Sequence, residues 1–352
     1  MSLIFTFHSF GELVESILAL IGSVLLPLLP VVFGILAYFD IISLTFLKVA
    51  LFFCFVLFVI LPIIYKYSYT LQRYAVFLTF VHVPAFPDYK NPSAYGLKGS
   101  RNFYINTDDG VKLGVWQILP ENITDFEGSD ESFEDILDNG QDIIIYSHGN
   151  GGTRLSDHRI EMYKVLRKFF HVFAFDYRGY GDSSSSSPSE IGCVNDLLNI
   201  YKWIQNRTKS LDRPLGLILE APFNNMKEEI SEFPLAQLFK HLPWFKMTVV
   251  NPMAKNFPFT TDKYICGIDI PVMILHAKDD KVVPYKLGYK LYQSAEKCRL
   301  DTQGGVIFHS FDEKYHFGHK FICKALDLSD KIRDFTTYVY TFQKNHKTVL
   351  NE

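Results

Sequence analysis

The sequence contains little cysteine and no marked excess of charge of either sign. Its 352 residues include 5 cysteines, none of them in a C-x-x-C pair, and the formal net charge at pH 7 is −3. Cysteines this widely spaced argue against a zinc site and against a small fold held together by disulfides. Nucleic-acid binding calls for a basic surface, which this composition does not suggest. We therefore expect no metal, no cofactor and no nucleic-acid partner.

Charge is also scarce near the N-terminus. Residues 16–39 carry no charged side chain, and residues 41–65 carry only Lys48. A membrane-spanning helix needs about 20 apolar residues, and both stretches reach that length. One interpretation is a helical hairpin that turns between Asp40 and Lys48. The other is a single span over residues 48–65 that follows an interfacial or re-entrant segment. We favour the hairpin.

Two features of the sequence point to opposite sides of the membrane for the domain that follows. No Lys or Arg precedes Lys48, whereas Lys66 and Arg73 follow the second apolar stretch, so the positive-inside rule places the domain in the cytosol. Asn122-Ile-Thr and Asn206-Arg-Thr are glycosylation sequons, which matter only in the lumen. Sequons also occur by chance, and so the residues alone leave the orientation open.

From about residue 101, short apolar runs alternate with helical patterns. The stretch NFYINTDDGVKLGVWQIL predicts a β-hairpin that turns at Asp108-Asp109-Gly110. Residues 121–142 hold nine acidic residues and no basic one, which is typical of an exposed loop. The alternation predicts an α/β fold with a mostly parallel sheet and helices on both faces. The expected domains are a membrane anchor (1–66), a juxtamembrane connector (67–100) and the α/β domain (101–345).

Three features at the ends of the predicted strands suggest a catalytic site. In YSHGNGG, a buried strand runs into a turn whose backbone N–H groups, from Gly149, Asn150 and Gly151, can converge on a developing oxyanion. Asp280 follows a late strand and His319 follows the last one. Singly, these features are as well explained by a βα turn, a helix cap and a structural histidine. Together they follow the triad order of α/β-hydrolases, in which the acid precedes the histidine.

Neighbouring residues suit these roles less well. We expect Asp279 to face solvent. His276 lies within a predicted strand, His309 lies at a strand end, and His316 is also less suitable than His319. The five serines of Ser183–Ser187 follow RGYGD and are expected to form a solvated turn.

Five segments resemble the membrane-anchored lipases of the type-twelve α/β-hydrolase-domain family: HGNGGTRLSDHRIEMYKVL, FDYRGYGDS, LILEAPFNNMKEE, ILHAKDDKVVP and GHKFI. The resemblance covers roughly residues 67–340. It implies an α/β-hydrolase fold and hydrolysis of lysophosphatidylserine and monoacylglycerols, with a lipid substrate and the membrane as partners. It assigns Asp280 as the acid, His319 as the base and the Gly149–Gly151 turn to the oxyanion hole. Family members have one membrane span and face the lumen of the endoplasmic reticulum, where we expect this domain.

The resemblance also reveals a missing segment. The family places a strand, a G-x-S-x-G elbow and a helix between the helix that ends near Arg207 and the strand LILE. This chain has only RTKSLDRPLG there, and G-x-S-x-G occurs nowhere in the sequence. Ser210 lies in a short polar linker and cannot replace the nucleophile. About 30 residues, enough for one strand and one helix, are lacking at a seam close to Ser210–Leu211.

The missing segment has a chemical and a structural consequence. We expect an α/β-hydrolase fold without one central strand and its following helix, so that LILE moves into the vacant position or leaves backbone groups unpaired. We also expect a lipase-family chain that is inactive for want of its serine. The alternative is a non-catalytic lipid-binding or interaction protein.

The segment EEISEFPLAQLFKHLPWFKMTVV is apolar and is interrupted by Pro234 and Pro243. It forms an acyl-chain pocket or rests on the bilayer in one interpretation, and packs its aromatic side chains onto the sheet in the other. We weigh the two equally. Its large apolar residues are Phe233, Leu235, Leu238, Phe239, Leu242, Trp244 and Phe245.

Overall fold

The strands of the α/β domain form two separate sheets. The computed structural model describes residues 17, 20–81, 87–208 and 214–349. Within them the first sheet has the order β1-β2-β4-β3 and the second the order β5-β6-β7. The strands are β1 (Ser100–Asn106), β2 (Lys112–Ile118), β3 (Asp142–Ser147), β4 (Phe170–Phe175), β5 (Leu217–Glu220), β6 (Val272–Ala277) and β7 (Val306–Phe311).

The strands pair mostly in parallel, as predicted. β2 pairs antiparallel with both β1 and β4, whereas the pairs β3–β4, β5–β6 and β6–β7 are parallel. β1 and β2 are the predicted hairpin. The N–H of Thr107 donates to the carbonyl of Val111 at 2.8 Å across the turn, and Gly110 has a φ of +79°, which a residue with a Cβ adopts only with strain. The hairpin is confirmed.

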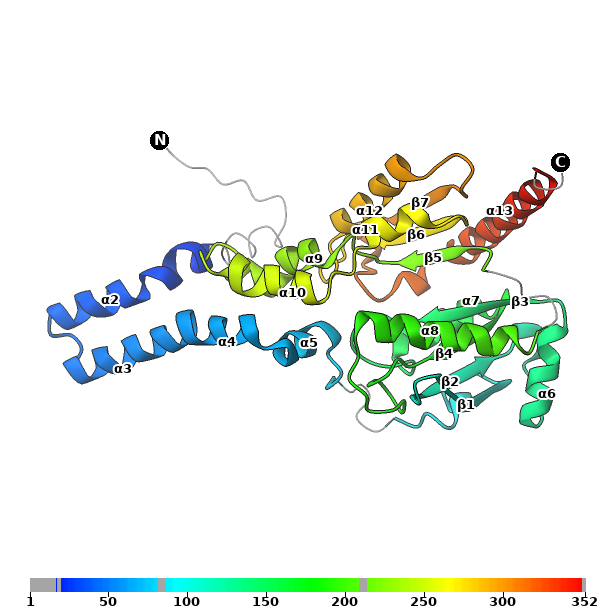
Figure 1. Ribbon diagram of the computed structural model, residues 1–352, viewed down its shortest axis with the longest axis horizontal. Coiled ribbons are helices and arrows are strands. Elements are labelled where there is room, and N and C mark those ends of the chain that lie inside the picture. The colour runs from blue at the N-terminus through cyan, green and yellow to red at the C-terminus, as the bar shows by residue number, and fades with distance from the viewer. Residues whose placement is uncertain (1–16, 18–19, 82–86, 209–213, 350–352) are drawn as a thin grey trace.

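Helices cover both faces of the sheets (Figure 1). α7 (Asp157–Leu166) and α13 (Leu328–Val349) cover one face, and α8 (Glu190–Gln205) and α12 (Tyr285–Cys298) cover the other. Alternate residues of each central strand point to opposite faces. In β4, Val172 and Ala174 pack under α7, whereas Phe173 and Phe175 pack under α8.

The two faces differ in how they join the sheets. Under α7 and α13, one core contains residues of both sheets, including Val172 and Ala174 of β4 and Met273 and Leu275 of β6. On the opposite face the apolar clusters under α8 and under α12 are separate, and each contains strand residues of one sheet only. The sheets are therefore held together mainly through the face under α7 and α13.

No strand of the described residues lies between β3 and β5. β3 pairs only with β4, and β5 pairs only with β6. Every residue of β4 and β6 is buried, whereas all of β5 and the first five residues of β3 are partly exposed, and the last residue of β3 is exposed. The strand LILE, which is β5, has therefore not moved into pairing with β3. The seam at Ser210–Leu211 lies outside the described residues.

The N-terminal helices form a hairpin that projects from the α/β domain (Figure 1). A π-helical turn (Ile21–Leu25) leads into α2 (Leu26–Tyr38), and after a turn that contains Asp40, α3 (Leu44–Phe55), a second π-helical turn (Val56–Ile60) and α4 (Leu61–Tyr67) form one continuous helix. This helix of 24 residues is long and apolar enough to cross a membrane. α2 is shorter, so the number of crossings stays a prediction.

A buried glutamine ties the end of this helix to the α/β domain. Gln72, in α5 (Tyr69–Phe77), donates through its amide nitrogen to the carbonyls of Tyr65 at 2.8 Å and Lys66 at 3.0 Å. Its amide oxygen accepts from Asn256, at the end of α10 (Asn251–Asn256), at 2.7 Å. The last carbonyls of a helix have no partner within the helix. Gln72 supplies partners for two of them and fixes the helix to α10.

Two predictions about loops are wrong. The acidic stretch, predicted to be an exposed loop, contains the helix α6 (Asp130–Asp135). Phe133 within this helix and Leu137 just after it are buried, and they hold the stretch against the domain despite its charge. The serine run is not a solvated turn throughout. Ser183 accepts from the N–H of Gly114 at 2.9 Å, and Ser184 accepts from the N–H of Lys112 at 2.9 Å, which fastens the run to β2.

The second half of the domain contains shorter elements. α9 (Met226–Glu232), a 3₁₀ turn (Pro234–Leu238) and a π-helical turn (Lys246–Val250) lead into α10, and α11 (Thr261–Tyr264) precedes β6. The last helix, α13, begins at Leu328, and the residues before it, 320–327, form a 3₁₀ turn and loop.

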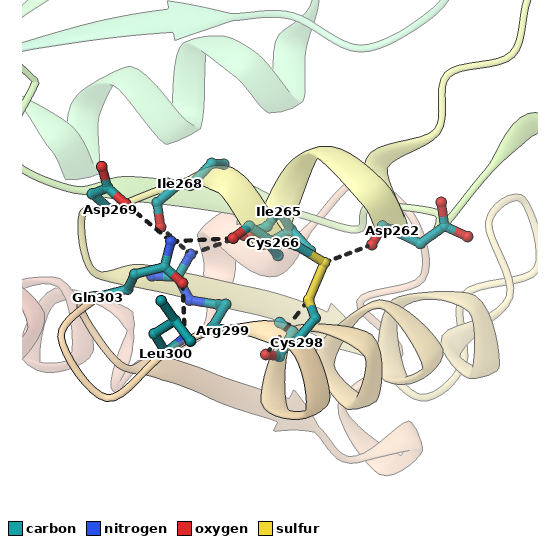
Figure 2. Close-up of a disulfide and its surroundings, with 10 residues drawn as sticks. Asp262, Ile265, Cys266, Ile268, Asp269, Cys298, Arg299, Leu300 and Gln303 are labelled. Atoms are coloured by element: carbon teal, nitrogen blue, oxygen red, sulfur yellow. Dashed lines mark hydrogen bonds between the residues drawn. A yellow bond between two sulfur atoms is a disulfide. The ribbon is translucent and has the colours of Figure 1, made fainter.

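A disulfide that the sequence did not predict joins Cys266 to Cys298 (Figure 2). It links the turn before β6 to the last residue of α12. Arg299, next to it, donates to the carbonyls of Ile265 at 3.0 Å and Ile268 at 2.5 Å. Because the two cysteines are 32 residues apart, spacing gave no reason to pair them.

Candidate active site

The structure brings Asp280 and His319 together at the carboxyl ends of β6 and β7. Nδ1 of His319 lies 2.8 Å from Oδ2 of Asp280. The other oxygen, Oδ1, accepts from the backbone N–H groups of Val282 at 2.9 Å and Val283 at 3.0 Å. Asp280 is buried, while His319 is partly exposed. The carboxylate is thus held rigidly, with the imidazole between it and the open side of the site.

The surroundings of Asp280 keep it ionised. Burial by itself would raise the pKa of this carboxyl, but hydrogen bonds from His276 and His319 and from the N–H of Val282 outweigh burial and lower the pKa to about 2. An ionised carboxylate can only accept, so Nδ1 of His319 carries the proton and Nε2 is left free to act as a base.

His276 is a partner of Asp280 that the sequence did not reveal. Its Nε2 lies 2.9 Å from the carbonyl oxygen of Val283 and 3.4 Å from Oδ2 of Asp280. The ring is fully buried, and a Cβ on Gly288 of α12 would come within 2.1 Å of its Nδ1. We set His276 aside because it lies in a strand. Only the fold shows that β6 aims it at the loop that carries Asp280.

Asp279 does not face solvent as we predicted. Its Oδ2 accepts from the N–H of Gly318 at 3.0 Å, and its Oδ1 is buried. Gly318 has a φ of +54° and directly precedes His319. The two adjacent aspartates therefore fix the histidine from two directions, one through its ring and the other through the backbone before it.

Arg159 fixes the glycine-rich turn that follows β3. This buried residue of α7 donates to the carbonyls of Gly149 at 3.1 Å, Gly151 at 2.8 Å and Thr153 at 2.7 Å. The φ of Gly151 is +71°, in the region that favours glycine. The hydroxyl of Tyr180 holds Asn150, with 3.2 Å between the two oxygens. Sequence reasoning missed Arg159 because it lies on the following helix, ten residues from Gly149.

A large cavity of about 1370 Å³ runs alongside these groups. His319 and the turn from Gly149 to Gly152 line one part of it, and apolar side chains line most of the remainder. Ligand pockets usually measure roughly 300–1,000 Å³ and are mainly apolar with a few polar groups. The cavity is therefore suited to a ligand that is larger and more apolar than a typical metabolite.

Two carboxyl groups face the same cavity. Glu220 ends β5, Glu229 lies in α9, and burial raises the pKa of each to about 7, against the opposing effect of nearby His319. Nothing in the sequence singles out either residue. Both acquire their surroundings from elements distant in the chain.

The apolar segment before α10 does not pack onto a sheet. Its buried core, Leu242 and Phe245, forms a cluster with Phe58 of the apolar helix Leu44–Tyr67, and no strand residue belongs to that cluster. Phe233, Phe239, Trp244 and Phe245 line the cavity. Of the two interpretations, the pocket is the one the structure favours. The side chain of Leu235 lies outside the described residues.

Proteins of known activity resemble this chain over most of its length. No protein-family model matches it. Lysophosphatidylserine lipase ABHD12 of Danio rerio is 36% identical over 310 residues, which cover 79% of this chain and 80% of that protein. The chain belongs to the ABHD12 family. The ABHD12 protein of Bos taurus is 35% identical and covers 82% of the chain, and Protein ABHD12B of Homo sapiens is 31% identical and covers 74%.

A solved structure agrees with the fold of this ABHD12-family chain. The Pyrococcus furiosus esterase Pf2001 has a TM-score of 0.52 and 18% sequence identity, and the match covers 73% of this chain and 96% of the esterase. The family resemblance drawn from the five sequence segments and the α/β-hydrolase fold are both confirmed. The absence of a nucleophile segment and the roles of individual site residues stay predictions.

Because the pKa of Asp280 is lowered on folding, the carboxylate stabilises the folded state above about pH 4, and this stabilisation is lost as the pH falls toward 2. The unfolding free energy of the wild type contains a pH-dependent contribution from ionised Asp280 that the Asp280→Asn variant lacks. We expect this contribution to be about 2 kcal/mol at pH 6 and to shrink progressively below pH 4. Urea unfolding in detergent micelles from pH 6 to pH 3 measures this. Asp301→Asn, at an exposed position, is the control, and a difference for Asp280→Asn that does not change with pH would contradict the account.

Proposed function

We propose that this chain is a membrane-anchored lipase of the serine-hydrolase type that keeps its lipid-binding site but is inactive, because its G-x-S-x-G nucleophile is absent. The observation that carries the proposal is an assembled Asp280–His319 pair beside a large apolar cavity, in a sequence without G-x-S-x-G. The family relatives are lysophosphatidylserine lipases. A lysophospholipid or a monoacylglycerol is therefore the ligand class that we propose.

The chemistry depends on the absent serine. In an α/β-hydrolase, the histidine removes the serine proton as the oxygen attacks the ester carbonyl, and the aspartate stabilises the resulting imidazolium. Here we propose Asp280 as the acid, His319 as the base and the Gly149–Gly151 turn as the first part of the oxyanion hole. The second part would be the N–H after the serine. Loss of the elbow removes both the nucleophile and that donor.

The lengths of the matches support the loss of an internal segment. The match with the Danio rerio protein extends over 310 residues, whereas 79% of this 352-residue chain is about 278. At about 32 positions of the alignment, therefore, the relative has a residue and this chain has a gap. One strand and one helix have about this combined length. The separation of the sheets between β3 and β5 is consistent with a gap at that position.

The second candidate function is a non-catalytic lipid-binding or interaction role. The cavity favours it, because its apolar lining does not depend on the nucleophile. The two functions differ in one respect. Restoring a serine elbow would turn a lipase scaffold into an enzyme, whereas a protein adapted to binding alone would remain inactive.

For location, we propose the membrane of the endoplasmic reticulum, with residues 1–66 as anchor, 67–100 as connector and 101–345 as the luminal domain. The disulfide between Cys266 and Cys298 supports an oxidising compartment, because disulfides are rare in the cytosol (Figure 2). Both sequon residues, Asn122 and Asn206, are exposed and so accessible for glycosylation. The charges that follow the helix argue less strongly, because large domains cross membranes regardless of charge.

A fluorophosphonate probe tests the absent nucleophile. We expect no labelling of the chain above background. Grafting the matching segment of the Danio rerio relative between Arg207 and Pro214 should produce labelling at the introduced serine. His319→Ala in the graft should then reduce the labelling rate by about 100-fold or more, because it removes the general base. Labelling of any serine in the ungrafted chain would contradict the proposal, and an unreactive but folded graft would favour the binding role.

Glycosidase treatment tests the luminal assignment. Protein expressed in cells should lose mass in electrophoresis after deglycosylation, and Asn122→Gln and Asn206→Gln should each abolish one step of the shift. Both asparagines are exposed, so the substitutions should leave folding unchanged. A membrane-inserted protein that shows no shift, and whose domain is digested by protease in sealed microsomes, would place the domain in the cytosol.

A further inference from the structure

The wall of the cavity includes the helix that is able to cross the membrane. Leu57, Phe58, Leu61, Ile64 and Tyr65 all line it. These positions recur at helical spacing and so lie on one face of the helix Leu44–Tyr67. Residues between them, such as Val59 and Ile63, are exposed and are not part of the lining.

From this arrangement we infer that the cavity receives its lipid sideways from the bilayer, with the acyl chain lying along the face of α4 that contains Leu61. The inference rests on the lipid-binding function proposed above and adds the route and the binding surface. A ligand that arrives through water has no need of a wall built from a membrane helix. A lipid already in the bilayer can enter without exposing its acyl chain to water, which is unfavourable for apolar surface.

A second part of the wall is also apolar, and it is fixed to the helix. Phe239, Trp244 and Phe245 line the cavity, and they pack in one cluster with Phe58. The hydroxyl of Tyr65 lies 2.8 Å from the sulfur of Met253 in α10. These contacts fix the helix to the apolar segment and to α10. The part of the cavity that the helix and the apolar segment line, called the channel below, is therefore a fixed part of the fold.

The lining of the cavity has two parts of different character. Side chains of α4 and of the segment before α10 are apolar, whereas Glu220 and Glu229, which lie near His319, form a polar part with the glycine-rich turn. A molecule that fills both parts of the cavity must have a long apolar portion and a polar portion. An acyl lipid with its ester next to His319 and its chain directed toward α4 meets this requirement.

The test uses full-length protein in phosphatidylcholine nanodiscs and lysophosphatidylcholine with a photoreactive diazirine at the end of its acyl chain. After irradiation, mass spectrometry locates the cross-linked residues. We expect cross-links within 57–65 and 239–245. Leu61→Trp narrows the channel and should reduce the 239–245 cross-links about fivefold or more. Ile63→Trp makes the same change at a position of similar exposure, 47% against 49%, outside the lining, and should leave them unchanged.

The outcomes separate the route from the function. Cross-links near His319 that are insensitive to Leu61→Trp would overturn the sideways route while leaving lipid binding in place. The absence of any cross-link in the domain would overturn both. If Leu61→Trp fails to fold, Leu57→Trp with Val59→Trp as its control replaces it.

Discussion

Side-chain packing under α7 and α13 joins the two sheets, because β3 and β5 each pair with a strand on one side only among the residues that the structure describes. The site depends on this packing directly. The glycine-rich turn follows β3 of the first sheet, whereas Asp280 and His319 follow β6 and β7 of the second. The relative position of the proposed oxyanion turn and the proposed base is therefore set by one apolar core, without the continuous hydrogen-bonded sheet that would otherwise fix it.

The same gap explains several unusual surroundings. β3 is apolar along four of its six residues and would be expected to be buried on both faces, yet it lies at an edge. Exposed apolar edges promote pairing between chains. Glu220 ends the other edge strand beside His319 and the cavity, where burial rather than a charged partner determines its titration. Binding of a lipid would cover part of this surface, which gives a folded but non-hydrolytic protein a physical role for its ligand.

Local patterns in the sequence predicted much of the fold. Apolar runs located the strands, Asp108-Asp109-Gly110 located the hairpin, and chain order placed Asp280 with His319. Features that depend on neighbours distant in sequence were missed. His276 and Arg159 act through contacts that exist only after their elements pack, and the pairing of Cys266 with Cys298 cannot be read from spacing. Charge misled us for the acidic stretch, because Phe133 and Leu137 decide its burial.

Among the described residues, no strand pairs with β3 and β5 between the two sheets, and the arrangement of the site depends on this more than on any other feature. Hydrogen–deuterium exchange of the protein in micelles, followed by mass spectrometry of peptides from each strand, measures this most directly. In a strand that has partners on both sides, the amides are hydrogen-bonded and exchange slowly. In an edge strand, the amides that point away from the partner strand exchange fast. We expect about half of the amides of β3 and β5 to exchange much faster than those of β4 and β6. Equal protection of all four strands would mean that β3 and β5 have partners and would contradict the account.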